Sequence, residues 1–141
     1  MNEEKNLEIV KQGYEHFANG DIAGLLALFD PDIEWVTPTV EGADHTGPRK
    51  GRDSLPEFFG QLDATEDISR FEPREFIAQD EKVVVLGNIK ATVKATGREY
   101  ETDWVHIFRL ADGKITGFTE FFDNAAVTKA FQKELTAGKT P

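Results

Sequence analysis

Apolar residues recur every three or four positions in several stretches of the chain, which is the spacing of an amphipathic helix. In the first of these stretches the apolar face consists of Leu7, Val10, Tyr14 and Phe17. Gly20 follows and supplies a helix stop. The spacing predicts helices over residues 3–19, 22–29, 55–62 and 124–135.

Polar residues that can cap a helix precede three of these segments. Asp21 stands before the second helix, where its side chain can accept a hydrogen bond from a free backbone N–H. Ser54, with Glu57 three residues later, matches a capping box before the third helix. Asn124 is the candidate cap for the last helix.

Alternation of apolar and polar residues predicts strands over residues 32–37, 68–78, 82–95, 98–110 and 114–123. Pro73 indicates an edge strand or a bulge, because proline cannot donate a ladder hydrogen bond. Thr96-Gly97 and Asp112-Gly113 are typical of hairpin turns. The last four strands are therefore expected to form an antiparallel meander.

Helices grouped first and long strands grouped later predict an α+β fold. We expect a single domain over residues 1–141, ordered over about residues 3–135, in which a cone-shaped, strongly curved antiparallel sheet wraps around the N-terminal helices. The concave face of such a sheet leaves a space that helices do not fill, and this space is a natural small-molecule pocket.

The turn at Asp112-Gly113 sets the register of the last hairpin and brings His106 opposite Glu120. On its own strand Glu120 lies between Phe118 and Phe122, which share its face. A histidine and a carboxylate facing each other among aromatic rings can act as an acid–base pair in proton transfer. A buried ion pair without a catalytic role explains the same residues equally well.

Aromatic residues are the candidates to line a pocket beside His106 and Glu120. We expect substrate-binding contacts from Tyr14, Trp35, Trp104, Phe118 and Phe122. His45 lies in the loop of residues 42–51, where it could cover the mouth of a pocket, but the favoured interpretation is an ordinary surface histidine. We expect no metal site, because Asp123 falls on the opposite strand face from Glu120.

Composition narrows the chemistry. The 141 residues include three histidines and no cysteine. The absence of cysteine excludes disulfides, iron–sulfur ligation and a thiol nucleophile. The net charge of −10 disfavours nucleic acid as a partner. The charged N-terminus is unlike a signal peptide, and no membrane-length apolar run is present, so a cytoplasmic protein without membrane contact is expected. Nucleotide and serine-hydrolase motifs are absent, and no cofactor is expected.

Several motifs together resemble the nuclear transport factor 2-like (cystatin-like) superfamily, within it the SnoaL-like and ketosteroid isomerase-like group. They are Asn19-Gly20-Asp21, Leu28-Phe29-Asp30-Pro31-Asp32, Ile33-Glu34-Trp35, residues 51–59 and the run from Val105 through Ile115 to Glu120 and Asp123-Asn124. The resemblance implies a cone-shaped fold, a pocket at its wide end and a homodimer across the outer face of the sheet, for which we expect contacts from Val105, Ile107, Thr119 and Phe121.

The resemblance also bears on Glu120. SnoaL-like cyclases carry an acid–base aspartate on the last strand, in a stretch resembling His-Trp-Asp, and the matching positions here are Phe118, Thr119 and Glu120. This implies an isomerase, cyclase, hydratase or hydrolase that works without a cofactor on a small apolar, carbonyl-bearing ligand, with Glu120 and His106 as catalytic residues. The alternative is a non-catalytic ligand-binding or dimerisation module.

Overall fold

The computed structural model describes residues 2–132. The helices are α1 (Asn2–Ala18), α2 (Ile22–Leu26), the 3-10 helix η1 (Arg52–Ser54), α3 (Leu55–Thr65) and α4 (Asn124–Phe131). The strands are β1 (Phe29–Val36), β2 (Pro48–Lys50), β3 (Glu66–Gln79), β4 (Lys82–Val93), β5 (Glu99–Ala111) and β6 (Lys114–Phe122). No helix among the described residues is long and apolar enough to cross a membrane.

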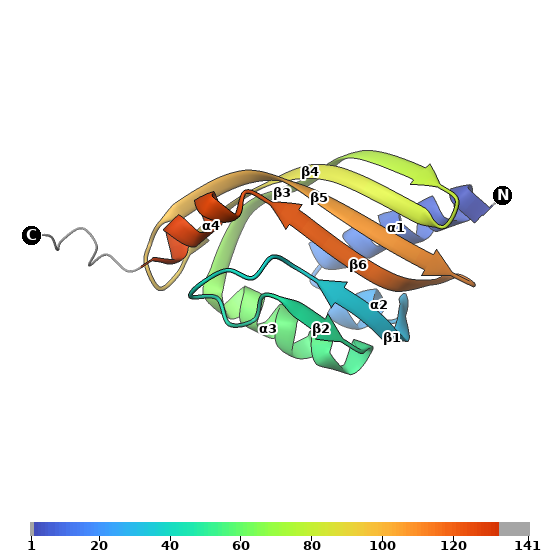
Figure 1. Ribbon diagram of the computed structural model, residues 1–141, viewed down its shortest axis with the longest axis horizontal. Helices are drawn as coiled ribbons and strands as arrows, with labels where there is room; N and C mark the ends of the chain where they lie inside the picture. Colours follow the sequence, from blue (N-terminus) through green and yellow to red (C-terminus); the bar gives the residue numbers. More distant parts are fainter. Residues whose placement is uncertain (1, 133–141) are drawn as a thin grey trace, which may run out of the picture.

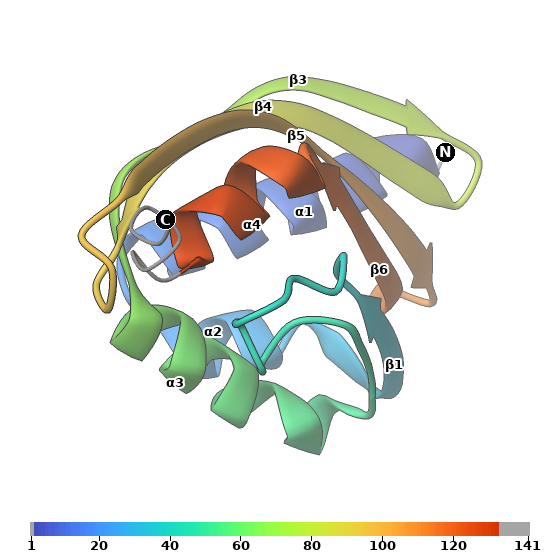
Figure 2. The same cartoon turned by 60° about the vertical axis from the view of Figure 1, so that its left-hand side comes forward.

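The strands form one six-stranded sheet in the order β2-β1-β6-β5-β4-β3. Strands β3 to β6 are an antiparallel meander, as predicted, and β1 joins β6 in parallel. The sheet arches over α1 and α4, while α2 and α3 lie across its open side (Figures 1 and 2). The α+β fold with a curved sheet around the N-terminal helices is therefore confirmed.

The turn chemistry accounts for the meander. Asp112 and Gly113 both adopt positive φ, the conformation that a tight two-residue hairpin turn requires. Strand β3 lies at the sheet edge, and its register shifts between Pro73 and Glu75. Pro73 thus marks both an edge strand and a bulge, as the sequence predicts. Strand β3 begins at Glu66, two residues before the expected start.

The cap predictions have mixed outcomes. Asp21 accepts a hydrogen bond from the backbone N–H of Gly24 and caps α2, as predicted. The capping box at Ser54 is wrong, because the Ser54 hydroxyl donates to the carbonyl of Gly51. Asp123 caps α4 in place of Asn124, which is the first helical residue. Residues 133–135, to which the last helix was expected to extend, lie outside the described residues.

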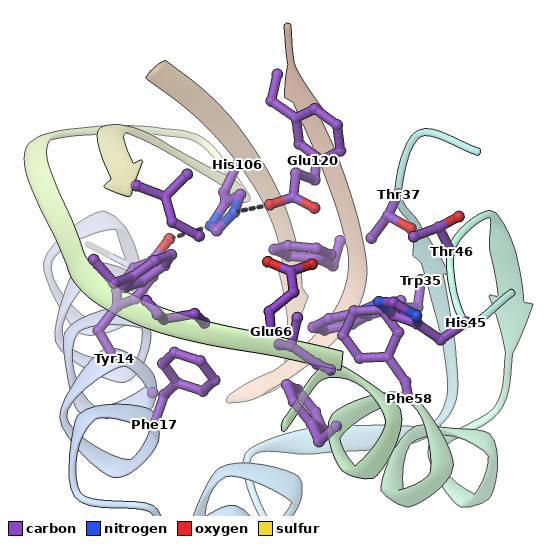
Figure 3. Close-up of a pocket in the computed structure, with 18 of the residues that line it drawn as sticks. Tyr14, Phe17, Trp35, Thr37, His45, Thr46, Phe58, Glu66, His106 and Glu120 are labelled. Carbon is purple, nitrogen blue, oxygen red and sulfur yellow. Dashed lines mark hydrogen bonds and ion pairs between the residues drawn. The ribbon is translucent and has the colours of Figure 1, made fainter. Parts of the chain in front are cut away.

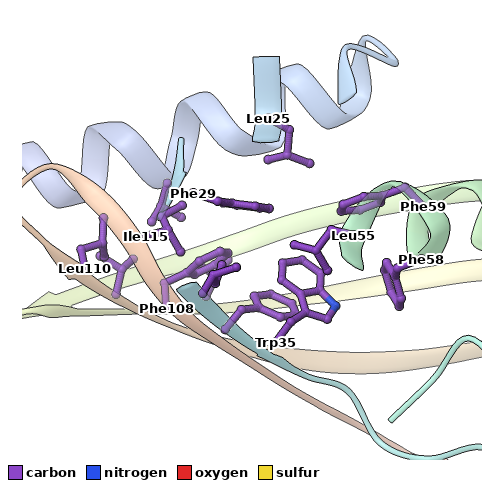
Figure 4. Packing of buried hydrophobic residues seen from close by; sticks show 14 of the residues in the cluster. Leu25, Phe29, Trp35, Leu55, Phe58, Phe59, Phe108, Leu110 and Ile115 are labelled. Carbon is purple, nitrogen blue, oxygen red and sulfur yellow. The ribbon is translucent and has the colours of Figure 1, made fainter. Parts of the chain in front are cut away.

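Aromatic residues dominate the core between the sheet and the helices (Figure 4). Trp35 stacks on Phe118 of the neighbouring strand at a centroid distance of 3.9 Å. Trp104 is buried against β4, where a Cβ at Gly87 would lie only 2.2 Å from its ring. Glycine at position 87 therefore makes room for the indole.

Candidate active site

A cavity of about 130 Å³ lies between the concave face of the sheet and the helices. Its walls are mostly aromatic and aliphatic, and polar side chains enter it from several elements (Figure 3). The polar lining residues are Tyr14, Thr37, His45, Thr46, Glu66, Tyr100, Thr102, His106 and Glu120. A mainly apolar cavity with a few converging polar groups is typical of a small-molecule site.

Three of these residues form a hydrogen-bonded chain that we call the triad: Tyr14, His106 and Glu120. His106 and Glu120 are register partners on β5 and β6, as predicted, and His106 Nε2 lies 2.9 Å from Glu120 Oε2. The Tyr14 hydroxyl, from α1, lies 2.7 Å from His106 Nδ1 (Figure 3). Both imidazole nitrogens of His106 are therefore engaged.

The direction of these hydrogen bonds follows from the two groups that flank His106. A carboxylate only accepts, so His106 Nε2 donates to Glu120 Oε2. Burial raises the pKa of the Tyr14 phenol well above the usual value, and the charge of Glu120 raises it further, so Tyr14 keeps its proton. In the tautomer that carries its proton on Nε2, His106 Nδ1 accepts from the Tyr14 hydroxyl.

Stacked rings fix the orientation of the imidazole. Trp104 lies against His106 at a centroid distance of 4.0 Å with an interplanar angle of 20°, and the Tyr14 ring is nearly parallel to the imidazole, at 7°. Trp104 itself packs on Phe71 at 4.9 Å. His106 is thus 5% exposed and held on all sides, whereas Glu120 retains partial access to the cavity.

Glu120 is the member of the triad that is most open to the cavity. Its Oε2 accepts from His106, and among the described residues no donor is assigned to Oε1. The side chain is 19% exposed and lines the cavity. A carboxylate with one oxygen held and the other open is suited to accept a proton from a bound molecule.

A second carboxyl group, that of Glu66, enters the same cavity from the start of β3 (Figure 3). It accepts a short hydrogen bond from the Tyr100 hydroxyl of β5. Burial raises the pKa of Glu66, the Tyr100 hydrogen bond opposes this, and the charge of Glu120 adds to the rise. Burial is the largest of these causes, so the environment shifts Glu66 toward its protonated form.

The loop between β1 and β2 contributes a further polar group. His45 is 3% exposed and packs on Phe58, which also contacts Trp35 of β1. The interpretation of His45 as a surface histidine is therefore wrong. Burial and the neighbouring Arg49 guanidinium lower the pKa of His45, so its ring is neutral near pH 7.

The structure brings most of the predicted site residues together. Glu120, His106, Tyr14, Trp35, Phe118 and Phe122 all line the cavity. Trp104 is not among its lining residues and instead forms the wall behind His106. Within residues 2–132, no group of three or more histidine, aspartate or glutamate side chains is placed to hold a metal ion.

Sequence reasoning missed Glu66 and Tyr100, and it gave His45 a place at the pocket only as the less favoured alternative. Glu66 lies two residues before the expected start of its strand, so strand parity did not test it. Tyr100 shares the face of His106 on β5, which was a usable signal. His45 is buried by the path of a loop, for which the sequence offers no periodic pattern.

Fold and cavity together define the class of this protein: an α+β cone of the nuclear transport factor 2-like type with a mainly apolar cavity. A family model described as a SnoaL-like domain matches residues 10–118. The chain belongs to this SnoaL-like family.

Solved structures and a sequence relative agree with this assignment. A nuclear transport factor 2-like protein from Burkholderia xenovorans LB400 superimposes with a TM-score of 0.84 at 34% identity, covering 94% of this chain and 99% of that one. TerC, co-crystallised with polyporic acid, gives 0.78 at 32% identity, covering 90% and 98%. An uncharacterised Mycobacterium tuberculosis (H37Rv) protein is 24% identical over 131 residues, 93% of this chain and 98% of its own.

Proposed function

We propose that the protein is an acid–base catalyst that moves a proton at a carbon next to a carbonyl group of a small apolar molecule, with Glu120 as the base. The single observation that carries the proposal is the arrangement of Glu120. Its side chain lines the cavity, its Oε2 accepts from His106, and no donor among residues 2–132 is assigned to its Oε1. His106 and Tyr14 position the carboxylate, and His106 also supplies a proton donor that stabilises its charge.

The step balances without a further reactant. The C–H bond breaks, its proton passes to Glu120, and its electron pair moves into the enolate, with charge on the carbonyl oxygen. Return of the proton to a different carbon is an isomerisation, and attack of the enolate carbon on a second carbonyl is a cyclisation. TerC, which is 32% identical and was co-crystallised with polyporic acid, supports a small-molecule site on this fold.

Deuterium exchange tests the proposal without knowledge of the natural substrate. Proton NMR in D₂O follows the loss of α-hydrogens from acetophenone and 2-indanone, which are small apolar ketones. Glu120→Gln is expected to reduce the enzymatic exchange rate roughly 10²–10⁴-fold, the usual contribution of a positioned base. Glu99→Gln, an exposed position on β5, is the matched control and is expected to retain the full rate.

Two results would oppose this function. Exchange in Glu120→Gln at the rate of the unmodified protein would remove Glu120 from its role. Binding of these ketones without any exchange would favour a non-catalytic binding module.

We also propose a homodimer formed through the convex face of the sheet. Cross-strand partners place an apolar row across five strands, and two of its members are unusually exposed, Ile77 at 52% and Val36 at 39%. Beside this row Phe121 is 54% exposed, opposite Val105. The whole row is Ile77, Val84, Ile107, Thr119 and Val36.

An exposed apolar patch of this kind favours burial against a second copy. Sedimentation velocity over a range of concentrations tests the dimer. Phe121→Asp is expected to shift the protein to monomer, because a buried charge without a partner opposes association. Gln61→Glu, on the exposed side of α3, is the control for added charge. A monomer at all concentrations of the unmodified chain would contradict the proposal.

A further inference from the structure

Three buried side-chain nitrogens of the described residues have no hydrogen-bond partner: Trp35 Nε1, His45 Nδ1 and Trp104 Nε1. Buried polar groups are nearly always paired, so each exception requires an explanation. Trp35 and His45 both line the cavity, whereas Trp104 does not. The first two, which we call the loop pair, therefore belong to buried side chains that line the cavity.

The loop pair is held in place from several directions. Both rings pack on Phe58, with centroid distances of 5.5 Å for Trp35 and 5.6 Å for His45 (Figure 3). Trp35 also stacks on Phe118. Arg49 donates from Nε to the backbone carbonyl of His45 at 3.2 Å.

The hydroxyl groups beside the loop pair are already used within the loop. Thr37 Oγ1 accepts from the backbone N–H of Gly47 at 3.0 Å. Thr46 Oγ1 accepts from the N–H of Val40 at 2.9 Å and donates to the carbonyl of Ala43. These bonds fix the loop, so the unpaired nitrogens are part of a preorganised arrangement.

The hydrogen-bonding capacity of the two loop-pair nitrogens determines which kind of atom they can bind. An indole N–H only donates, and a neutral imidazole donates when its proton is on Nδ1. The partner must therefore be an acceptor. Glu120 and Glu66 line the same cavity, and Glu120 is close enough to influence the titration of His45. A negatively charged acceptor is disfavoured here, which leaves an uncharged oxygen.

Cavity size and lining restrict the rest of the ligand. The volume of about 130 Å³ is close to that of an engineered apolar cavity of about 150 Å³ that binds benzene. Four of the lining residues around the loop pair are aromatic: Phe29, Phe58, Phe59 and Phe118. One ring with a short substituent fits this space.

We infer that Trp35 Nε1 and His45 Nδ1 bind the carbonyl oxygen of a small, uncharged aromatic ketone or aldehyde, and so determine which molecules enter the cavity. The inference rests on the proposed function in one respect: binding of the carbonyl oxygen would place the neighbouring carbon within reach of Glu120. Binding of the carbonyl by the loop pair is testable without any turnover.

Trp35 and Trp104 are the two tryptophans of the chain, so a ¹⁵N-labelled sample gives two indole N–H signals, assigned with Trp35→Phe. Acetophenone is the probe, ethylbenzene is the control of similar shape without the oxygen, and benzoate is the charged control. We expect acetophenone to move the Trp35 signal downfield, as a new hydrogen bond does, and to leave Trp104 almost unchanged. Ethylbenzene is expected to produce no downfield shift, and benzoate is expected to bind at least tenfold more weakly than acetophenone.

The same titrations in two histidine variants test His45. His45→Phe is expected to weaken acetophenone binding about five- to tenfold, the effect of one lost hydrogen bond, and to leave ethylbenzene binding within twofold. His16→Phe, at a position outside the cavity, is expected to alter neither. Equal Trp35 shifts with acetophenone and ethylbenzene, or no shift at saturation, would overturn the inference. A downfield Trp35 shift without deuterium exchange would support the inference and contradict the proposed function. Deuterium exchange without a Trp35 shift would support the proposed function and contradict the inference.

Discussion

The two polar ends of the cavity differ in how far their hydrogen bonds are satisfied. In the triad, each ring nitrogen of His106 has a partner, and Tyr14 and Glu120 complete the chain. In the loop pair, Trp35 Nε1 and His45 Nδ1 have no partner among the described residues. Buried groups with complete hydrogen bonds make a site rigid, whereas buried groups without partners are costly until a partner binds. The two ends of the cavity therefore differ in what a bound molecule could add to them.

Gly87→Ala is expected to have the largest effect, and it acts at the triad end of the cavity, through Trp104 behind His106. The added Cβ would lie 2.2 Å from the Trp104 ring and 2.5 Å from the backbone carbonyl oxygen of Glu72, so the indole must leave its stack on His106. Overpacking of this kind costs about 3 kcal/mol at the upper end of its usual range. Urea unfolding measures the loss, and the deuterium-exchange rate should fall with it.

Gly60→Ala provides the matched control for this substitution. Nothing lies within 4 Å of a Cβ at Gly60, which is in helix α3. Alanine there is expected to stabilise the protein by about 0.5–1 kcal/mol, because glycine is unfavourable inside a helix. Equal effects of the two variants would show that the close packing around Trp104 does not hold His106.

Tyr14→Phe compared with His45→Phe contrasts the two ends directly. Loss of the Tyr14 hydroxyl leaves His106 Nδ1 buried without a partner, which costs about 1–3 kcal/mol. His45→Phe removes a nitrogen that has no partner to lose, and its cost is expected to stay below about 1 kcal/mol. The free energies of unfolding of the two variants in urea, measured without ligand, test this difference. A larger loss in His45→Phe would mean that the loop pair is satisfied in the free protein.

The same contrast explains which parts of the site the sequence predicts. His106 and Glu120 face each other because the hairpin turn at Asp112-Gly113, which the sequence predicts, sets the register of β5 and β6. The burial of Trp35 follows from strand alternation. Turn residues and strand alternation are local patterns, and they predict the positions of His106 and Glu120 in the triad and of Trp35 in the loop pair.

Other contacts depend on tertiary structure that no local pattern encodes. Tyr14 reaches His106 across 92 positions of the chain, so its role as a hydrogen-bond donor needed the packing of α1 into the sheet. His45 is buried because its loop folds against Phe58. Glu66 meets Tyr100 through the curvature that brings the start of β3 toward the cavity. The sequence therefore predicts the fold and the strand-borne site residues, but not the groups contributed by loops and strand ends.

Glu66→Gln is expected to have the smallest effect, and it tests whether the second carboxyl group of the cavity is neutral. Burial raises the pKa of Glu66 above its ordinary value of 4.5 in the folded protein. Between 4.5 and that raised value the folded state holds a proton that the unfolded state has released, so stability falls as pH rises, with a slope of at most about 1.4 kcal/mol per pH unit. Below pH 4.5 this contribution is fully present.

Glutamine at position 66 does not titrate and can still accept the Tyr100 hydrogen bond, so this variant lacks that part of the slope. We therefore expect the two proteins to be similar in stability below pH 4.5 and Glu66→Gln to become the more stable one as pH rises above it. Thermal unfolding from pH 4 to pH 8 measures the difference, with Glu99→Gln as an exposed control. A constant difference across this range would mean that burial does not raise the pKa of Glu66 in the folded protein.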